Sequence, residues 1–267
     1  MERRRMIISA SRRCDIPNYH SAWFFNELKK RTMVVKHTPF LNKRIVITPE
    51  NVDCIVFWTK NPEPMMSRLN ELEGYAYYFQ FTLTGYSKRI EPGVPDKHHM
   101  IEVFQRLSQM TSRQQVIWRY DPIFLSPAYS VEYHKKAFRQ IAEALGGYTD
   151  RCVISFVDIY GKLKERLTSL QIREPNIGEI MELAAFISET AAKHGMQVES
   201  CAERIDLSAY NIHPTHCIDA KLIEQITDKT LNVTKDLSQR QACGCCSGVD
   251  IGSYHQCKNG CVYCYAN

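Results

Sequence analysis

An alternation of short apolar runs with longer amphipathic stretches constrains this chain more than any other feature. Runs rich in β-branched and aromatic residues predict strands at 6–11, 54–60, 77–84, 115–120, 152–158 and 196–200, with a shorter one at 44–48. Helical spacing predicts helices at 21–30, 63–72, 97–110, 131–145 and 177–193. Nearly continuous apolar strands separated by helices are typical of a covered parallel sheet. We therefore expect an α/β fold, a partial (β/α) barrel of mainly parallel strands.

The chain has 267 residues, a length that one barrel domain can occupy. Residues 1–200 carry the βα pattern and are expected to form the partial barrel. Residues 201–267 are rich in cysteine and turns, and end with one more predicted strand at 248–252. We expect this segment to belong to the same domain and to contribute its last strand.

Composition and charge exclude several classes of protein. Apolar residues make up 44% and charged residues 24% of the chain, which is ordinary for a globular protein and excludes disorder. The net charge of +5 permits an anionic partner without requiring one. The basic start is followed by too short an apolar run for a signal peptide, and no stretch reaches membrane-spanning length. We expect a cytoplasmic protein with no membrane partner.

Cysteine is unusually frequent and unevenly distributed. The chain has 11 cysteines, an odd number, and without an export signal a disulfide framework is disfavoured. Eight of them lie at or after position 201, and six lie in the last 25 residues. Such clustering indicates a metal or iron–sulfur site.

The last cysteines form a C-x3-C-x2-C motif. Cys257, Cys261 and Cys264 have this spacing, with Tyr263 directly before the third cysteine. Three thiolates on one loop can each bind one iron of a [4Fe–4S] cluster and leave the fourth iron open. The alternative is a structural zinc site, in which Cys261 and Cys264 would pair with Cys243 and Cys245. The three-cysteine spacing favours the iron–sulfur cluster.

This motif resembles that of the radical S-adenosylmethionine enzymes. The resemblance implies a [4Fe–4S] cluster whose open iron is chelated by S-adenosyl-L-methionine. Segments 79–84, 91–95 and 118–123, with Thr59-Lys60 at a strand end, look like the spore photoproduct lyase-like members of that group. Segments 9–13, 15–17, 57–62 and 260–267 resemble the DUF1848 proteins over nearly the whole chain.

The position of the motif departs from the usual radical enzyme, in which the cysteine loop follows the first strand. A circular permutation explains this difference if the strand at 249–252 pairs beside the strand at 6–11 and serves as the first barrel strand. We then expect the three cysteines to lie close to Ser9, Ser11, Lys60 and Thr82. The Gly-Gly-Glu element that often binds the cofactor is absent, so its role falls to polar groups at strand ends.

Polar side chains at the carboxyl ends of parallel strands meet at the mouth of a barrel, which makes them candidate cofactor contacts. The candidates are Ser9, Ser11, Thr59, Lys60, Thr82, Thr84 and Arg119. The resemblance implies that Lys60 pairs with the cofactor carboxylate, and the alternative is a solvated loop residue. For Arg119 the alternative is a structural ion pair with Asp121.

A second set of cysteines precedes the motif. Cys201, Cys217, Cys243 and Cys245 could close an auxiliary [4Fe–4S] cluster or a zinc site, or remain ordinary thiols. Cys246 is an alternative ligand to Cys245. The remaining three cysteines, Cys14, Cys54 and Cys152, lie in or beside apolar runs and are interpreted as core residues.

Two functions are compatible with these features. The first is a radical S-adenosylmethionine enzyme that forms a 5′-deoxyadenosyl radical, with an electron donor such as flavodoxin or ferredoxin. The second is a zinc- or cluster-stabilised protein that binds nucleic acid. The motifs do not identify a substrate, and nucleic acid is one candidate.

Overall fold

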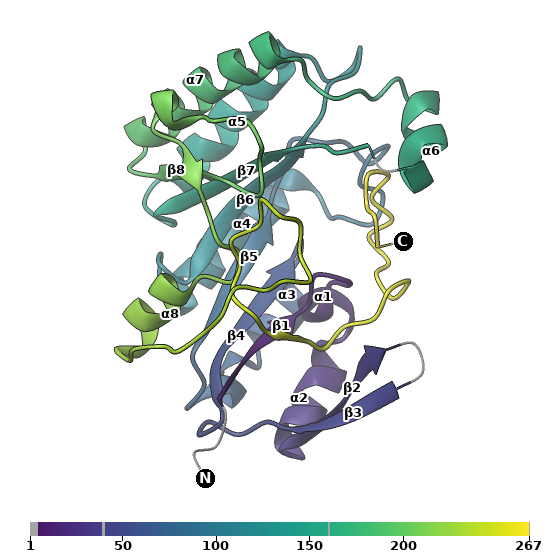
Figure 1. Cartoon of the computed structure of the whole chain (residues 1–267). Coiled ribbons are helices and arrows are strands. Elements are labelled where there is room, and N and C mark those ends of the chain that lie inside the picture. The colour runs from purple at the N-terminus through teal and green to yellow at the C-terminus, as the bar shows by residue number, and fades with distance from the viewer. Residues whose placement is uncertain (1–4, 39–40, 160, 267) are drawn as a thin grey trace.

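An eight-stranded sheet organises the computed structural model, which describes residues 5–38, 41–159 and 161–266 (Figure 1). The strand order is β10-β1-β4-β5-β6-β7-β8-β9, and neighbouring strands all pair in parallel. The strands are β1 (Met6–Ala10), β4 (Val52–Thr59), β5 (Tyr77–Thr82), β6 (Val116–Ile123), β7 (Arg151–Phe156), β8 (Gln197–Ser200), β9 (His213–Pro214) and β10 (Val249–Asp250). The predicted α/β fold with a mainly parallel sheet is confirmed. The sheet is open between β10 and β9, which is consistent with a partial barrel.

Helices follow most of the strands. They are α1 (Ile16–Tyr19), α2 (Ser21–Lys29), α3 (Glu63–Met66), α4 (Lys97–Met110), α5 (Val131–Leu145), α6 (Lys164–Ser169), α7 (Ile177–Lys193) and α8 (Ala220–Thr227), with 3-10 turns at Leu69–Leu72, Gly161–Leu163 and Ser208–Tyr210. The long helices begin at capping residues: Asp96 caps α4, Ser130 caps α5 and Asn176 forms a capping box with Glu179 in α7. Within the described ranges, no helix is long and apolar enough to cross a membrane.

Two predicted elements are present only in part. The predicted strand 44–48 is part of β3 (Leu41–Val46), which pairs antiparallel with β2 (Thr32–Thr38) in a separate sheet. Met33 and Ile45 are buried there while Val34 is half exposed, so the hairpin is covered on one face only. The predicted helix 63–72 is divided, because Arg68 leaves the helical conformation between α3 and the following turn.

The two faces of the sheet have different coverings. On one face, Phe57, Phe81 and Trp118 pack in the largest core cluster with side chains of α4, α5 and α7. On the other face, a cluster containing Val56 and Tyr78 packs against the segment 217–246, including α8. The cysteine-rich segment therefore covers the inner face of the partial barrel.

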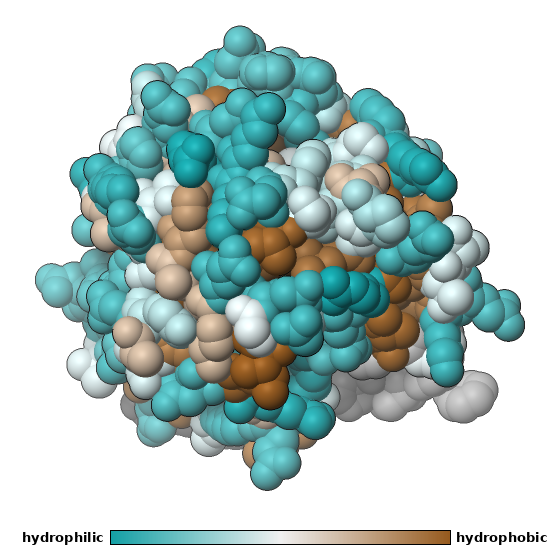
Figure 2. Space-filling view, turned by 90° about the horizontal axis from the view of Figure 1, so that it is seen from above, coloured by the Kyte–Doolittle hydropathy of each residue, from teal (hydrophilic) through white to brown (hydrophobic). Residues whose placement is uncertain are grey.

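The tail joins the sheet at β1. In β10, Val249 lies beside Ile8 and Asp250 beside Ser9, which confirms the predicted pairing of the tail strand with the first strand. The chain then runs toward α6, where Arg166 Nη2 donates to the carbonyl of Cys264 at 3.2 Å (Figure 1). Seen from above, the molecule shows mainly hydrophilic side chains, with apolar ones visible between them (Figure 2).

Candidate functional site

The cysteine loop 257–264 docks at the carboxyl ends of β4 and β5. Gly93 N donates to Asn259 O at 2.9 Å, and Val262 N donates to Ile90 O at 3.0 Å. A Cβ on Gly93 would lie 2.5 Å from the carbonyl oxygen of Lys258, so only glycine allows this approach. The loop is thus held along its length against the segment that follows β5.

A buried carboxylate, Glu91, lies under the loop and is 1% exposed. It accepts from Lys60 Nζ at 2.8 Å and from Thr84 Oγ1 at 3.0 Å, and also from Lys97 and the hydroxyl of Tyr263. Burial acts to raise the pKa of Glu91, but the two ammonium groups outweigh it and lower the pKa to about 2. Glu91 therefore stays ionised and fixes Lys60 beside the cysteine loop.

A second buried carboxylate, Asp15, ties the loop to the end of β4. It accepts from Thr59 Oγ1 at 2.7 Å, from Lys60 N at 2.8 Å and from Asn259 Nδ2 at 3.0 Å. Its donors are neutral, and burial raises the pKa of Asp15 above its ordinary value. Asp15 thus joins the strand end that carries Lys60 to the middle of the cysteine loop.

The three thiols of the motif lie close together, and besides burial the nearby Cys264 raises the pKa of both Cys257 and Cys261. Cys261 is 4% exposed, and Cys257 and Cys264 are half-buried. Burial raises the pKa of Cys261 to about 12, although the nearby Lys60 ammonium opposes this. Cys14, interpreted from the sequence as a core residue, is buried and lies near Cys257.

The donor set at this loop has the ligand type that an iron–sulfur cluster requires. Among the residues that the structure describes, no three Cys, His, Asp or Glu side chains are placed to hold one metal ion. A cluster has a different requirement, because each thiolate binds a different iron. Three neighbouring thiols on one docked loop meet that requirement in ligand type and number.

The second cysteine set gathers on the inner face of the sheet. Cys201 follows β8, and its Sγ lies 3.3 Å from Cys217 Sγ. Cys245 lies close enough to Cys217 and Cys243 to interact with both thiols. Cys246 has separate surroundings, the backbone of Ala220 and the carboxylates of Asp219 and Glu224.

The predicted cofactor contacts divide into three groups. Thr59, Lys60 and Thr84 lie with the cysteine loop through Asp15 and Glu91, as described above. Ser9 Oγ and Ser11 Oγ donate to Asp250 at 2.7 and 2.6 Å and so hold β10 to β1.

The third group belongs to the second cysteine set. Arg119 Nη1 donates to Cys217 Sγ at 3.0 Å, and Nη2 pairs with Asp121 at 2.5 Å. Thr82 is the register partner of Arg119 in the neighbouring strand.

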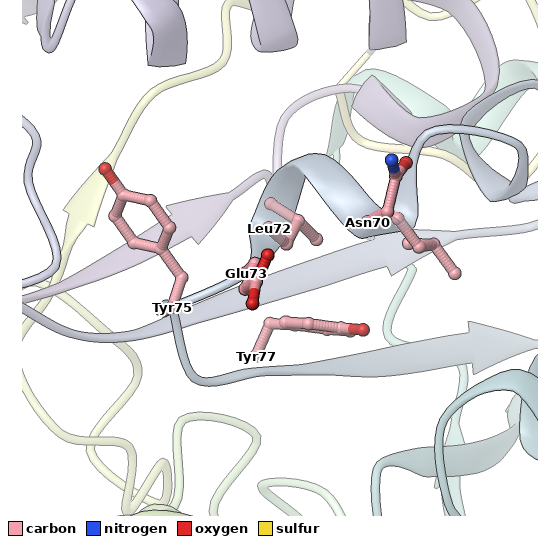
Figure 3. Close-up of a pocket in the computed structure, with 7 residues that line it drawn as sticks. Asn70, Leu72, Glu73, Tyr75 and Tyr77 are labelled. Carbon is pink, nitrogen blue, oxygen red and sulfur yellow. The ribbon is translucent and has the colours of Figure 1, made fainter.

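A large cavity opens beside the second cysteine set. It measures about 1460 Å³ and lies between the ends of β7 and β8, the start of α7 and residues 240–242. Glu203 is among its lining residues, and burial raises the pKa of Glu203 to about 7. A smaller cavity of about 330 Å³ is lined by residues 69–77 where β5 begins, and contains none of the predicted site residues (Figure 3).

Comparison with known proteins identifies the family. The family described as "Domain of unknown function (DUF1848)" matches residues 7–266. The chain belongs to the DUF1848 family. No curated protein matches this DUF1848 chain.

Among solved structures, a crystal structure from Bacteroides thetaiotaomicron VPI-5482, provisionally assigned as an alpha-L-fucosidase, is 13% identical to the DUF1848 chain with a TM-score of 0.31. The match covers 76% of the DUF1848 chain and 75% of the other chain. A similarity this low supports no inference about fold or activity.

Sequence reasoning did not select the groups that position the site. Asp15, Glu91 and Asp250 bind predicted candidates, and Asn259 binds Asp15, but none of these four residues was itself predicted. The signal for Asp15 was available, because an aspartate shortly before a proline is typical of a helix cap, and Asp15 caps α1. For Glu91, the signal was an acidic residue directly before Pro92 in the segment 91–95.

Proposed function

We propose that this chain is a radical S-adenosylmethionine enzyme, with a [4Fe–4S] cluster on Cys257, Cys261 and Cys264. The observation that carries the proposal is the docking of the C-x3-C-x2-C loop at the carboxyl ends of parallel strands, where an α/β barrel places its chemistry. When bound, the cluster and S-adenosylmethionine supply a 5′-deoxyadenosyl radical that abstracts hydrogen from a substrate.

The order of the strands supports a permuted form of the radical enzyme barrel. In this proposal β10 serves as the first barrel strand, because the cysteine loop follows it directly and it pairs beside β1. The carboxylate of Asp250 accepts from Ser9, Ser11 and the backbone N–H of Arg12, which fixes the join between the chain's two ends.

The chain's own residues position the loop. Tyr263, which lies between the second and third cysteines, donates to Glu91. Asn259, which lies between the first and second cysteines, donates to Asp15. Metal binding requires thiolates, so the low exposure of Cys261 couples its deprotonation to iron binding. The Lys60 ammonium favours the negative charge of the loaded site.

The hydrogen bond between Lys60 and Glu91 limits how Lys60 can bind the cofactor. Because Lys60 Nζ already binds Glu91, pairing with a cofactor carboxylate requires it to share its three N–H donors between two carboxylates. Lys97 contributes a second ammonium to Glu91, which keeps Glu91 paired while Lys60 shares its donors.

The test is anaerobic reconstitution with iron and sulfide, followed by reduction in the presence of S-adenosylmethionine. We expect about four irons per chain at this site and release of 5′-deoxyadenosine, with flavodoxin or ferredoxin able to replace a chemical reductant. Changing Cys257, Cys261 and Cys264 together to Ala should remove these irons and abolish cleavage. Cys54→Ala, in the middle of β4, should retain both.

Two outcomes would contradict the proposal. If iron content and reductive cleavage both survive the triple change, the cluster is not bound by this loop. A colourless protein that binds only zinc at the loop would favour the nucleic-acid-binding alternative.

A further inference from the structure

We propose that Cys201, Cys217, Cys243 and Cys245 bind one Zn²⁺, and that this ion links segments adjoining the two open edges of the sheet. The site is separate from the C-x3-C-x2-C loop and does not depend on radical chemistry. Its four ligands come from three places in the chain, and the fold brings them together on the inner face of the sheet.

The four sulfurs lie near one another. Cys201 Sγ is 3.3 Å from Cys217 Sγ, and Cys245 lies close enough to Cys217 and Cys243 to interact with both thiols. The N–H of Ile218 donates to Cys245 Sγ at 3.4 Å. A Cβ on Gly244 would lie 2.2 Å from the ring of His216, so the glycine between the last two ligands allows their loop to approach Cys217.

Two arginines supply positive charge at this set. Arg119, which is 5% exposed, donates to Cys217 Sγ at 3.0 Å. Arg12 lies within electrostatic range of Cys245 and Cys217, and its Nη2 is the buried side-chain nitrogen without a partner among the described residues. A buried donor without an acceptor is costly, and four neutral thiols offer it only weak acceptors. One Zn²⁺ with four thiolates carries a charge of −2 and supplies anionic sulfur to both guanidinium groups.

The compactness of the set favours a single ion over a cluster. Zn–S bonds of about 2.3 Å place tetrahedral sulfurs about 3.8 Å apart, whereas a cluster separates its thiolates further because each binds a different iron. Cys201 and Cys217 Sγ are 3.3 Å apart, which is closer than zinc permits and agrees with the finding that no described ligand group can hold an ion as placed. Opening this pair by about 0.5 Å gives the zinc distance.

The location of the ligands gives the ion its role. Cys201 directly follows β8, next to the edge strand β9, and Cys245 precedes the opposite edge strand β10 by four residues. Arg119 reaches the set from β6 near the middle of the sheet. The ion would therefore link the segments that follow one edge of the open sheet to the segment that precedes the other edge, and its binding energy would stabilise the packing of residues 217–246 on the inner face.

The experiment measures metal in the Cys257→Ala/Cys261→Ala/Cys264→Ala background, so that the first site cannot contribute. We expect about one zinc per chain, and visible absorption bands of a tetrahedral thiolate complex after replacement by Co²⁺. Cys245→Ser should lose the ion, and Cys246→Ser is the matched control that should keep it. Arg12→Gln should speed zinc release to a chelator by about tenfold, and Arg13→Gln should not.

If Cys245→Ser does not fold, zinc removal from the unmutated chain tests the same proposal. Removal of zinc with a chelator should then make residues 228–248 sensitive to protease, and added zinc should restore protection. Zinc absent from the background protein, or kept by Cys245→Ser, would overturn the proposal. Iron with sulfide in place of zinc would assign an auxiliary cluster and also overturn it.

Discussion

At the scale of single residues, the two buried carboxylates at the cysteine loop differ in how their charge is balanced. Asp15 accepts from neutral donors, whereas Glu91 pairs with the ammonium groups of Lys60 and Lys97. Removing one partner from a buried ion pair leaves an uncompensated charge, which costs more than the pair contributes. Glu91 is therefore the more sensitive of the two positions.

We predict that Glu91→Ala lowers the free energy of unfolding by about 3 to 5 kcal/mol, because it leaves two ammonium groups without their carboxylate. Urea denaturation of the metal-free protein measures this. Glu189→Ala, which removes the exposed partner of Lys193, should leave the free energy of unfolding nearly unchanged. Equal costs for the two variants would show that Glu91 does not anchor this region.

The clustering of the thiols could be predicted from the sequence, whereas the carboxylates that position their loop could not. Cysteine spacing and strand ends placed Cys261 near Lys60, and the structure has them as neighbours. The partner of Lys60, however, lies 31 residues away in a loop. Apolar periodicity defines strands and helices but not the path of a loop, so Glu91 and Asp15 could not be assigned as partners.

At the scale of elements, β10 is held to β1 mainly by side-chain hydrogen bonds, because a strand this short has little backbone pairing. It has two residues, and Asp250 accepts from Ser9, Ser11 and the backbone N–H groups of Arg12 and Gly252. The segment 248–252 was predicted to be a strand, although nothing in a run this short indicates that its acidic side chain would anchor it.

We predict that Asp250→Ala loosens the tail, because four donors lose their acceptor together. Limited proteolysis should cut residues 247–256 at least tenfold faster than in the unmutated chain, since about 1.4 kcal/mol of lost stability gives that factor. Asp206→Ala, at an exposed aspartate, is the control and should leave the rate unchanged. Equal rates for both variants would mean that backbone pairing alone holds β10.

At the scale of the whole molecule, most strands and the long helices followed from periodicity, while β2, its antiparallel pairing with β3 and the cover over the inner face did not. The hairpin is half-buried and lies outside the main sheet. The segment 217–246 covers the inner face although its sequence is rich in turns, because α8 contributes the buried Leu222 and Ile223. Local patterns could not show which face of the sheet would receive it.

The stability of the whole chain should depend on pH through Glu203. Burial raises its pKa to about 7, Asp158 and Asp121 act in the same direction, and Arg240 opposes them. Between its ordinary pKa near 4.5 and 7, the folded chain holds a proton that the unfolded chain has lost, so the free energy of unfolding falls as pH rises. The loss is at most about 3 kcal/mol.

Glu203→Gln should remove this dependence while keeping an oxygen to accept from the N–H of Phe156. We expect equal stability of the variant and the unmutated chain near pH 4, and a more stable variant at pH 8, by urea denaturation at both values. A difference that is the same at both pH values would show that Glu203 does not titrate in this range.

The short length of the two edge strands also affects whether copies of this chain can associate edge to edge. β9 and β10 have two residues each, and β9 ends in Pro214, which cannot donate to a ladder. Another chain therefore finds little free backbone on which to extend the sheet, which is how native proteins avoid aggregation. Release of the tail would uncover the five residues of β1 as a template, so light scattering should rise in solutions of Asp250→Ala.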